Sequence, residues 1–125
     1  MKLTVTSEDK KRTKVAQPGW VTLEITGVKD ELAKDRQSMN AVIDFLIVSS
    51  GTNEGIPIRY WVNEKFPAMH RSLIEALLGG STSDDEATAF DFSPTLKGRK
   101  VLANVVNNKL DSGRIVNNVD EFKPL

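Results

Sequence analysis

Residues 56–80 read IPIRYWVNEKFPAMHRSLIEALLGG, and this stretch decides the fold because it joins a strand-like run to a helical one. In its first part apolar residues fall at every second position, with Ile58, Tyr60 and Val62 on one side. A period of two predicts a strand that is buried on one face. Pro57 limits this strand to an edge of the sheet or places it at the strand's start, because proline has no amide hydrogen for the ladder.

The second part of the stretch has the spacing of an amphipathic helix. Its apolar residues recur three and four positions apart, which puts them on one stripe of the helix. They are Met69, Leu73, Ile74, Leu77 and Leu78. Gly79-Gly80 is expected to end the helix, since glycine readily adopts the left-handed conformation of a helix C-cap.

Two further strand-like runs precede this stretch and two follow it. They cover residues 21–26, 41–48, 100–106 and 114–119, and residues 107–113 between the last two have the composition of a turn. Three strands, one helix and two strands follow one another in a five-stranded oligonucleotide-binding (OB) barrel. The sequence therefore predicts a mainly β, OB-like barrel with one helix between strands three and four. A small α+β domain of another topology is the alternative.

The chain has 125 residues, which suits a single domain with one core. Residues 1–17 are expected to form a flexible or edge-pairing arm, and Pro18-Gly19 opens a barrel domain over residues 18–125. The biased segment 79–87 is interpreted as a loop. Alternation along the strands predicts one core that the helix covers through Leu73, Ile74 and Leu77; the strand residues in it are Leu23, Ile25, Phe45, Ile58, Tyr60, Val101 and Val105.

Little in the chain suits catalysis. It has no cysteine and one histidine, His70, so thiol nucleophiles, disulfides and histidine or thiolate metal clusters are excluded. His70 lies next to the helical stripe and is interpreted as a surface or partly packed residue. Gly79-Gly80 ends a helix instead of starting one, and Asp84-Asp85-Glu86 lacks the ligand spacing of a calcium site. We therefore expect no enzymatic activity, no metal and no cofactor.

No segment has the length of a membrane span, and residues 1–16 lack the apolar stretch of a signal peptide. These observations predict a cytoplasmic protein without membrane contact.

The formal net charge is zero, which argues against a polycation that binds DNA by charge alone. Basic residues nevertheless gather in loops apart from the acidic residues of 84–91. If these loops border one groove, they can hold phosphates; the alternative is that they only solubilise the surface. The candidate phosphate-binding residues are Arg59, Lys34, Arg36, Lys97, Arg99, Lys100, Lys109 and Arg114.

Two tryptophans are candidate stacking platforms for nucleobases. Trp61 has the strand parity opposite to Tyr60 and Val62, so it is expected to point outward, with Arg59 on the same face. Trp20 has the same outward parity in the first strand. Single-strand binding needs aromatic surfaces beside cations. The alternative is that either tryptophan caps the barrel or packs under the N-terminal arm or the helix.

Several short motifs resemble those of a family of small phage proteins. The motifs are Pro18-Gly19-Trp20, Leu77-Leu78-Gly79, Leu96-Lys97-Gly98-Arg99-Lys100, Val116-Asn117-Asn118-Val119 and Phe122-Lys123-Pro124. The phage proteins are encoded among replication and recombination functions and are taken to be OB-like single-stranded-DNA binders. The resemblance thus implies single-stranded DNA as a partner and the host cytoplasm as the location.

The expected function is binding of single-stranded nucleic acid, DNA in preference to RNA, with little sequence preference, in phage-type DNA replication or recombination. The alternative is a structural or adaptor protein that self-associates or docks to a phage or host protein.

Overall fold

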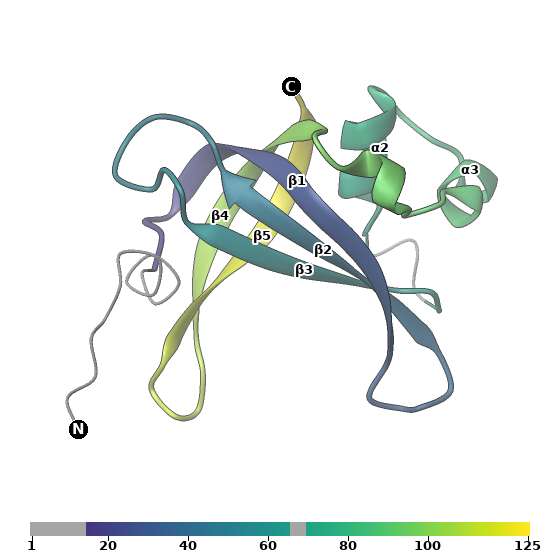
Figure 1. Ribbon diagram of the computed structural model, residues 1–125, viewed down its shortest axis with the longest axis horizontal. Coiled ribbons are helices and arrows are strands. Elements are labelled where there is room, and N and C mark those ends of the chain that lie inside the picture. Colours follow the sequence, from purple (N-terminus) through teal and green to yellow (C-terminus); the bar gives the residue numbers. More distant parts are fainter. Residues whose placement is uncertain (1–14, 66–69) are drawn as a thin grey trace.

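The computed structural model describes residues 15–65 and 70–125 (Figure 1). Most of the predicted N-terminal arm, and Met69 of the predicted helical stripe, lie outside the described residues. The strands are β1 (Gly19–Leu32), β2 (Met39–Ile47), β3 (Pro57–Asn63), β4 (Lys100–Lys109) and β5 (Ile115–Pro124). The helices between β3 and β4 are α2 (Arg71–Leu78), α3 (Asp84–Ala89) and the short 3-10 helix η2 (Pro94–Leu96).

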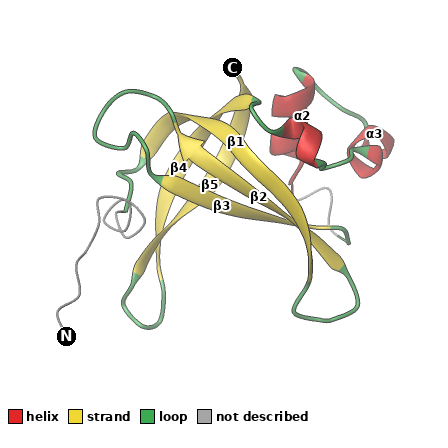
Figure 2. Ribbon diagram, in the orientation of Figure 1, coloured by secondary structure: helices red, strands yellow, loops and turns green. Residues whose placement is uncertain are grey.

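The strands form one antiparallel sheet in the order β3-β2-β1-β4-β5 (Figure 2). The long central strand β1 pairs with β4 through its first residues, up to Glu24, and with β2 from Leu23 onward. A register shift between Ile25 and Gly27 separates two regular parts of the β1–β2 ladder, as a β-bulge does. The mainly β class, the five strands and the helical segment before β4 are therefore confirmed.

The sheet is not closed into a barrel, which corrects the finer part of the fold prediction. The edge strands are β3 and β5, and within the described residues no ladder joins them. They approach each other through side chains: the rings of Tyr60 and Phe122 meet edge to face with centroids 5.2 Å apart. Pro57 lies at the first position of edge strand β3, as its missing amide hydrogen predicts.

The core lies on the inward face of the curled sheet. The predicted strand residues are buried there, except that Tyr60 is only partly buried. α2 covers the core through Leu73 and Leu77, of which Leu77 is 4% exposed. As predicted, α2 ends at Gly79, whose left-handed φ of 82° lets its N–H bond the Glu75 carbonyl oxygen at 2.8 Å.

The segment 79–87 is not only a loop, because α3 begins at Asp84. Its start is a capping box: the Ser83 hydroxyl accepts a hydrogen bond from the Glu86 N–H, and the Glu86 carboxylate accepts one from the Ser83 N–H. The carboxylates of the first turn also favour the positive end of the helix dipole. The Ser83-x-x-Glu86 spacing is the sequence sign that the loop interpretation missed.

Candidate functional site

Trp61 lies on the outer face of β3, as its parity predicts. Trp61 is 51% exposed, whereas the adjacent Val62 is buried in the core. An indole in this position presents a large flat apolar surface to solvent. A flat aromatic surface of this kind is available for stacking or for packing against a partner.

The cross-strand neighbours of Trp61 are a buried valine and a lysine. Trp61 pairs with Val42 of β2, and Val42 pairs with Lys29 of β1. Val42 has outward parity and no place in the inward core, yet it is 0% exposed. Neighbouring side chains therefore cover Val42, and Trp61 and Lys29 are its cross-strand neighbours on this face. The outer face of β1, β2 and β3 around this row is called the Trp61 face below.

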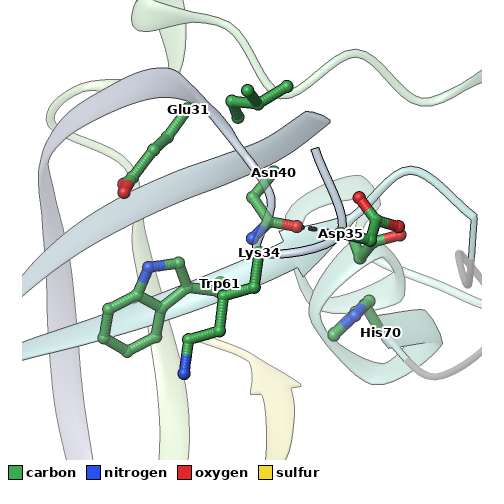
Figure 3. A pocket seen from close by; sticks show the side chains of 8 residues that line it. Glu31, Lys34, Asp35, Asn40, Trp61 and His70 are labelled. Carbon is green, nitrogen blue, oxygen red and sulfur yellow. Dashed lines mark hydrogen bonds between the residues drawn. The ribbon is translucent and has the colours of Figure 1, made fainter. Parts of the chain in front are cut away.

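A cavity of about 710 Å³ opens beside the Trp61 face. Its lining combines an aromatic ring with carboxylates, amides and a lysine, and the Lys34 side chain of the β1–β2 loop extends into it near the indole (Figure 3). The lining residues are Glu31, Leu32, Lys34, Asp35, Asn40, Trp61, Asn63 and His70. A cavity of this size lies in the usual range for ligand sites.

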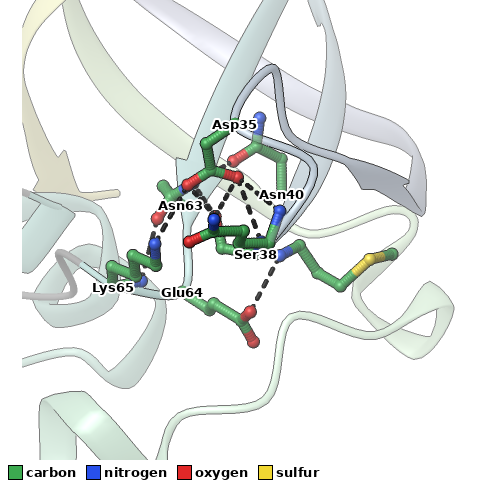
Figure 4. Close-up of polar contacts among 8 residues, drawn as sticks. Asp35, Ser38, Asn40, Asn63, Glu64 and Lys65 are labelled. Atoms are coloured by element: carbon green, nitrogen blue, oxygen red, sulfur yellow. Dashed lines mark hydrogen bonds and ion pairs between the residues drawn. The ribbon is translucent and has the colours of Figure 1, made fainter.

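Asp35 anchors the β1–β2 loop beside the cavity (Figure 4). Its carboxylate accepts hydrogen bonds from the N–H groups of Gln37 and Ser38, at 2.9 and 3.1 Å, and from the Ser38 hydroxyl. Lys65, after β3, adds an ion pair at 3.0 Å. The hydrogen bond from Gln37 and then that from Lys65 hold the pKa of Asp35 far below its ordinary value. The loop that carries Lys34 is thus fixed to the end of β3.

His70 forms the far wall of the cavity, just before α2. Its Nδ1 lies 2.7 Å from the Tyr60 hydroxyl, and the two rings meet edge to face. Burial lowers the pKa of His70 and raises the pKa of Tyr60. His70 is therefore a partly packed residue, as expected, and in its neutral form it can accept the tyrosine hydrogen bond.

Arg59 shares the outer face of β3 with Trp61, but it is already paired. Its Nε donates to the Asp44 carboxylate at 2.7 Å, across the β2–β3 ladder. The hydrogen bond and then the charge of Asp44 raise the pKa of Arg59. Arg114, from the β4–β5 turn, lines a second hollow together with Arg59 and Asp44. The structure thus brings Arg114 to the β3 edge, as the groove prediction requires, while part of the Arg59 charge is offset.

Trp20 lies on a different surface. It is 46% exposed, but it pairs with Asn104 of β4, and the Lys123 ammonium of β5 lies 4.7 Å from its ring centroid. Along β1 it precedes Lys29 by nine residues, which at 3.3 Å per residue is about 30 Å of strand. The two outward tryptophans therefore do not form one platform.

The remaining predicted cations are divided between structural contacts and free surface. Arg99 donates from Nη2 to the Leu77 carbonyl oxygen at 2.6 Å, at the end of α2, so it has a structural task. Lys100 faces Glu24 at 4.0 Å. Lys97 and Lys109 are exposed, as is Arg36, which takes a left-handed φ of 57° in the β1–β2 loop. Of the predicted phosphate-binding residues, Lys34 alone lines the Trp61 cavity.

Comparisons with known proteins yield no match, either among protein-family models or among curated proteins. Within residues 15–65 and 70–125 no helix is long and apolar enough to cross a membrane. The same residues contain no group of three or more potential metal ligands of the His, Cys, Asp or Glu type.

Proposed function

We propose that the chain is an OB-like domain that binds single-stranded DNA with its Trp61 face. The strand order supports the OB-like assignment, because β1, β2 and β3 form a meander, helices follow β3, and β4 returns to pair with β1. An OB-fold is a partly open five-stranded barrel, and its edges need only approach one another as Tyr60 and Phe122 do here. In that fold the face of strands two and three and the two adjoining loops bind oligonucleotides.

Trp61 is the observation that carries this function. Its indole is half-exposed beside Val42 on the expected binding face, and every base has a flat ring that can stack on such a surface. Stacking is tolerant of sequence, which agrees with a general single-strand binder. We assign Trp61 the role of the principal stacking residue.

Phosphate contacts come from cations around the same face. Lys29 lies in the row of Trp61, Lys34 lines the cavity, and Arg114 lies at the adjoining β3 edge. Arg36, exposed in the loop next to Lys34, extends this basic rim. With zero net charge, the chain relies on these few local cations, so its affinity is expected to depend on both stacking and salt. The role proposed with this binding is in phage-type DNA replication or recombination in a host cytoplasm, as the sequence resemblance implies.

A docking or adaptor protein is the second candidate, and one observation favours it. Leu32 and Met39 pair across the β1–β2 ladder next to the cavity, and both are strongly exposed. Leu32 also lines the cavity with Trp61, so this end of the sheet carries exposed apolar side chains on which a second copy or another protein could dock. Non-enzymatic binding is common to both candidates.

Fluorescence anisotropy of a labelled thymidine oligonucleotide separates the two candidates. Binding that weakens as salt rises, with a log–log slope of about −0.7 for each phosphate contact, is expected for the DNA-binding function. The same thymidine strand, annealed to a complementary adenosine strand, serves as the control. This duplex is expected to bind more weakly, since its bases are not free to stack on the protein. Absence of oligonucleotide binding at low salt, together with concentration-dependent self-association, would favour the docking protein.

A further inference from the structure

Glu31 is an unexpected residue on a surface that binds a polyanion. It follows Lys29 on the outer side of β1, and its carboxylate is directed into the cavity on the side of Trp61 (Figure 3). It has no ion-pair partner within 4 Å in the described part of the chain, and its charge also contributes to raising the pKa of Arg59 on β3. A carboxylate there repels phosphates, so its natural ligand is a group that donates hydrogen bonds.

Asn40 lies directly opposite Glu31 in the β1–β2 ladder and lines the same cavity. Its Oδ1 accepts a hydrogen bond from Asn63 Nδ2 at 2.8 Å. The amide nitrogen of Asn40 is therefore left to face the cavity, on the Trp61 side (Figure 3). An amide held this way offers only N–H donors to a ligand.

The direction of the Asn40 amide is fixed by a chain of hydrogen bonds (Figure 4). At one end the Lys65 N–H donates to Asn63 Oδ1 at 2.9 Å, which turns Asn63 Nδ2 toward Asn40 and Ser38. At the other end Asp35 accepts from the buried Ser38 hydroxyl, whose oxygen in turn accepts from Asn63. A backbone N–H can only donate and a carboxylate can only accept, so both ends impose the same direction.

We propose that Glu31, Asn40 and Trp61 form a guanine-selective base subsite in the single-strand surface. The base stacks on the Trp61 indole, the Glu31 carboxylate accepts from guanine N1–H and N2–H, and Asn40 Nδ2 donates to O6. Directly opposed residues on paired strands have Cβ atoms about 5 Å apart, which suits neighbouring groups on one base edge. Among the four bases guanine alone presents two adjacent N–H donors to a carboxylate, and an unpaired base leaves that edge free. This selectivity rests on the proposed function and adds one base preference to a surface that is otherwise tolerant of sequence.

Competition between labelled oligonucleotides tests the subsite on the intact chain. The host is a run of about 12 thymidines, within the site size of one OB domain, and one central position carries thymidine, guanosine, cytidine, adenosine or inosine. Guanosine is expected to bind roughly 5- to 10-fold more tightly than thymidine, the lower range for one bidentate base contact. Inosine lacks the N2 amino group and is expected to lose most of that gain, without any change to the protein.

Glu31→Gln is the variant that addresses the carboxylate, because it replaces one of the two acceptor oxygens by an NH2 donor that faces a guanine N–H. It is expected to abolish the preference for guanosine over thymidine. Glu54→Gln, in the exposed β2–β3 loop, makes the same charge change away from the cavity and is expected to keep the preference.

Each outcome bears on a distinct claim. Equal binding of all the oligonucleotides, or a preference for cytidine, would overturn the guanine subsite and leave single-strand binding intact. Failure to bind any of them would overturn the proposed function and the subsite together. A guanosine preference that persists in Glu31→Gln would also refute the role of the carboxylate.

Discussion

The Tyr60 hydroxyl lies 2.7 Å from Nδ1 of His70, so a hydrogen bond joins strand β3 to the start of α2. Phe122 of β5 also meets the tyrosine ring edge to face, with centroids 5.2 Å apart. Tyr60 thus connects both sheet edges with the helix that covers the core, and its partner is the only histidine of the chain.

Stability is expected to fall when His70 is protonated. Burial lowers the pKa of His70 in the folded state, so the unfolded chain binds more protons between the folded pKa and the ordinary value. The stability that neutral His70 contributes is therefore fully present above about pH 6.5, the ordinary histidine pKa. It is lost as the pH falls through the lower pKa of the folded state. Thermal unfolding at about pH 7.5 and about pH 5.5 measures the difference. His70→Gln, which can still accept the tyrosine hydrogen bond, should show a smaller difference; an unchanged one would assign the pH dependence to other groups.

Leu77→Ala is expected to destabilise the fold strongly, because Leu77 is 4% exposed and seals the core from α2. Loss of a buried leucine side chain costs about 2–5 kcal/mol of unfolding free energy. Its neighbour Leu78 is 52% exposed and provides a matched control, for which Leu78→Ala should change stability by no more than about 0.5 kcal/mol. Urea denaturation of both variants compares them, and equal losses would contradict the packing of α2.

Asp35→Asn is expected to loosen the β1–β2 loop while leaving the sheet folded. The variant removes the ion pair with Lys65 and weakens the hydrogen bonds that the Gln37 and Ser38 N–H groups donate to residue 35. Hydrogen exchange of these two amides should accelerate relative to amides of β2, and oligonucleotide affinity should fall because Lys34 is no longer held at the cavity. Asp111→Asn, in the exposed β4–β5 turn, is the control. Unchanged exchange at Gln37 and Ser38 would show that Asp35 does not anchor the loop.

Lys29→Ala combined with Lys34→Ala is expected to flatten the salt dependence of binding. Each lost phosphate contact reduces the log–log slope by about 0.7 for a single strand. Lys97→Ala with Lys100→Ala removes the same charge near β4, away from the Trp61 cavity, and should leave the slope close to that of the wild type. If the β4 pair reduced the slope more than the Lys29 and Lys34 pair, the binding face would have to move toward β4 and Trp20.

The strands and α2 could be predicted from the sequence, because burial of one face gives the apolar residues of each element a regular spacing. The alternation around Leu23 and Ile58 reflects the buried face of each strand. The apolar stripe before Gly79 reflects the buried face of α2. β1 was predicted too short, since the register shift after Ile25 interrupts its alternation. The outward position of Trp61 followed from the same parity.

Features that depend on register between distant segments could not be predicted in this way. The pairing of Arg59 with Asp44 requires β2 and β3 to align at that residue, and the contact of Arg99 with the end of α2 requires the helix to be docked. Glu31 and Asn40 likewise become neighbours only through the β1–β2 ladder. The separation of Trp20 from Trp61 follows from strand order, which the local pattern does not contain.

Trp61→Ala tests the central claim most directly, measured by oligonucleotide anisotropy and urea denaturation of the same samples. Removal of the stacking surface is expected to weaken thymidine oligonucleotide binding by about 1–3 kcal/mol. The half-exposed side chain should cost the fold little beyond the exposure of Val42, and Trp61→Phe should restore part of the affinity. Trp20→Ala, on the β4 side, should leave affinity near that of the wild type. Unchanged affinity in Trp61→Ala, or loss of most of the unfolding free energy without a loss of binding, would contradict the role of Trp61 and leave the docking protein as the better account.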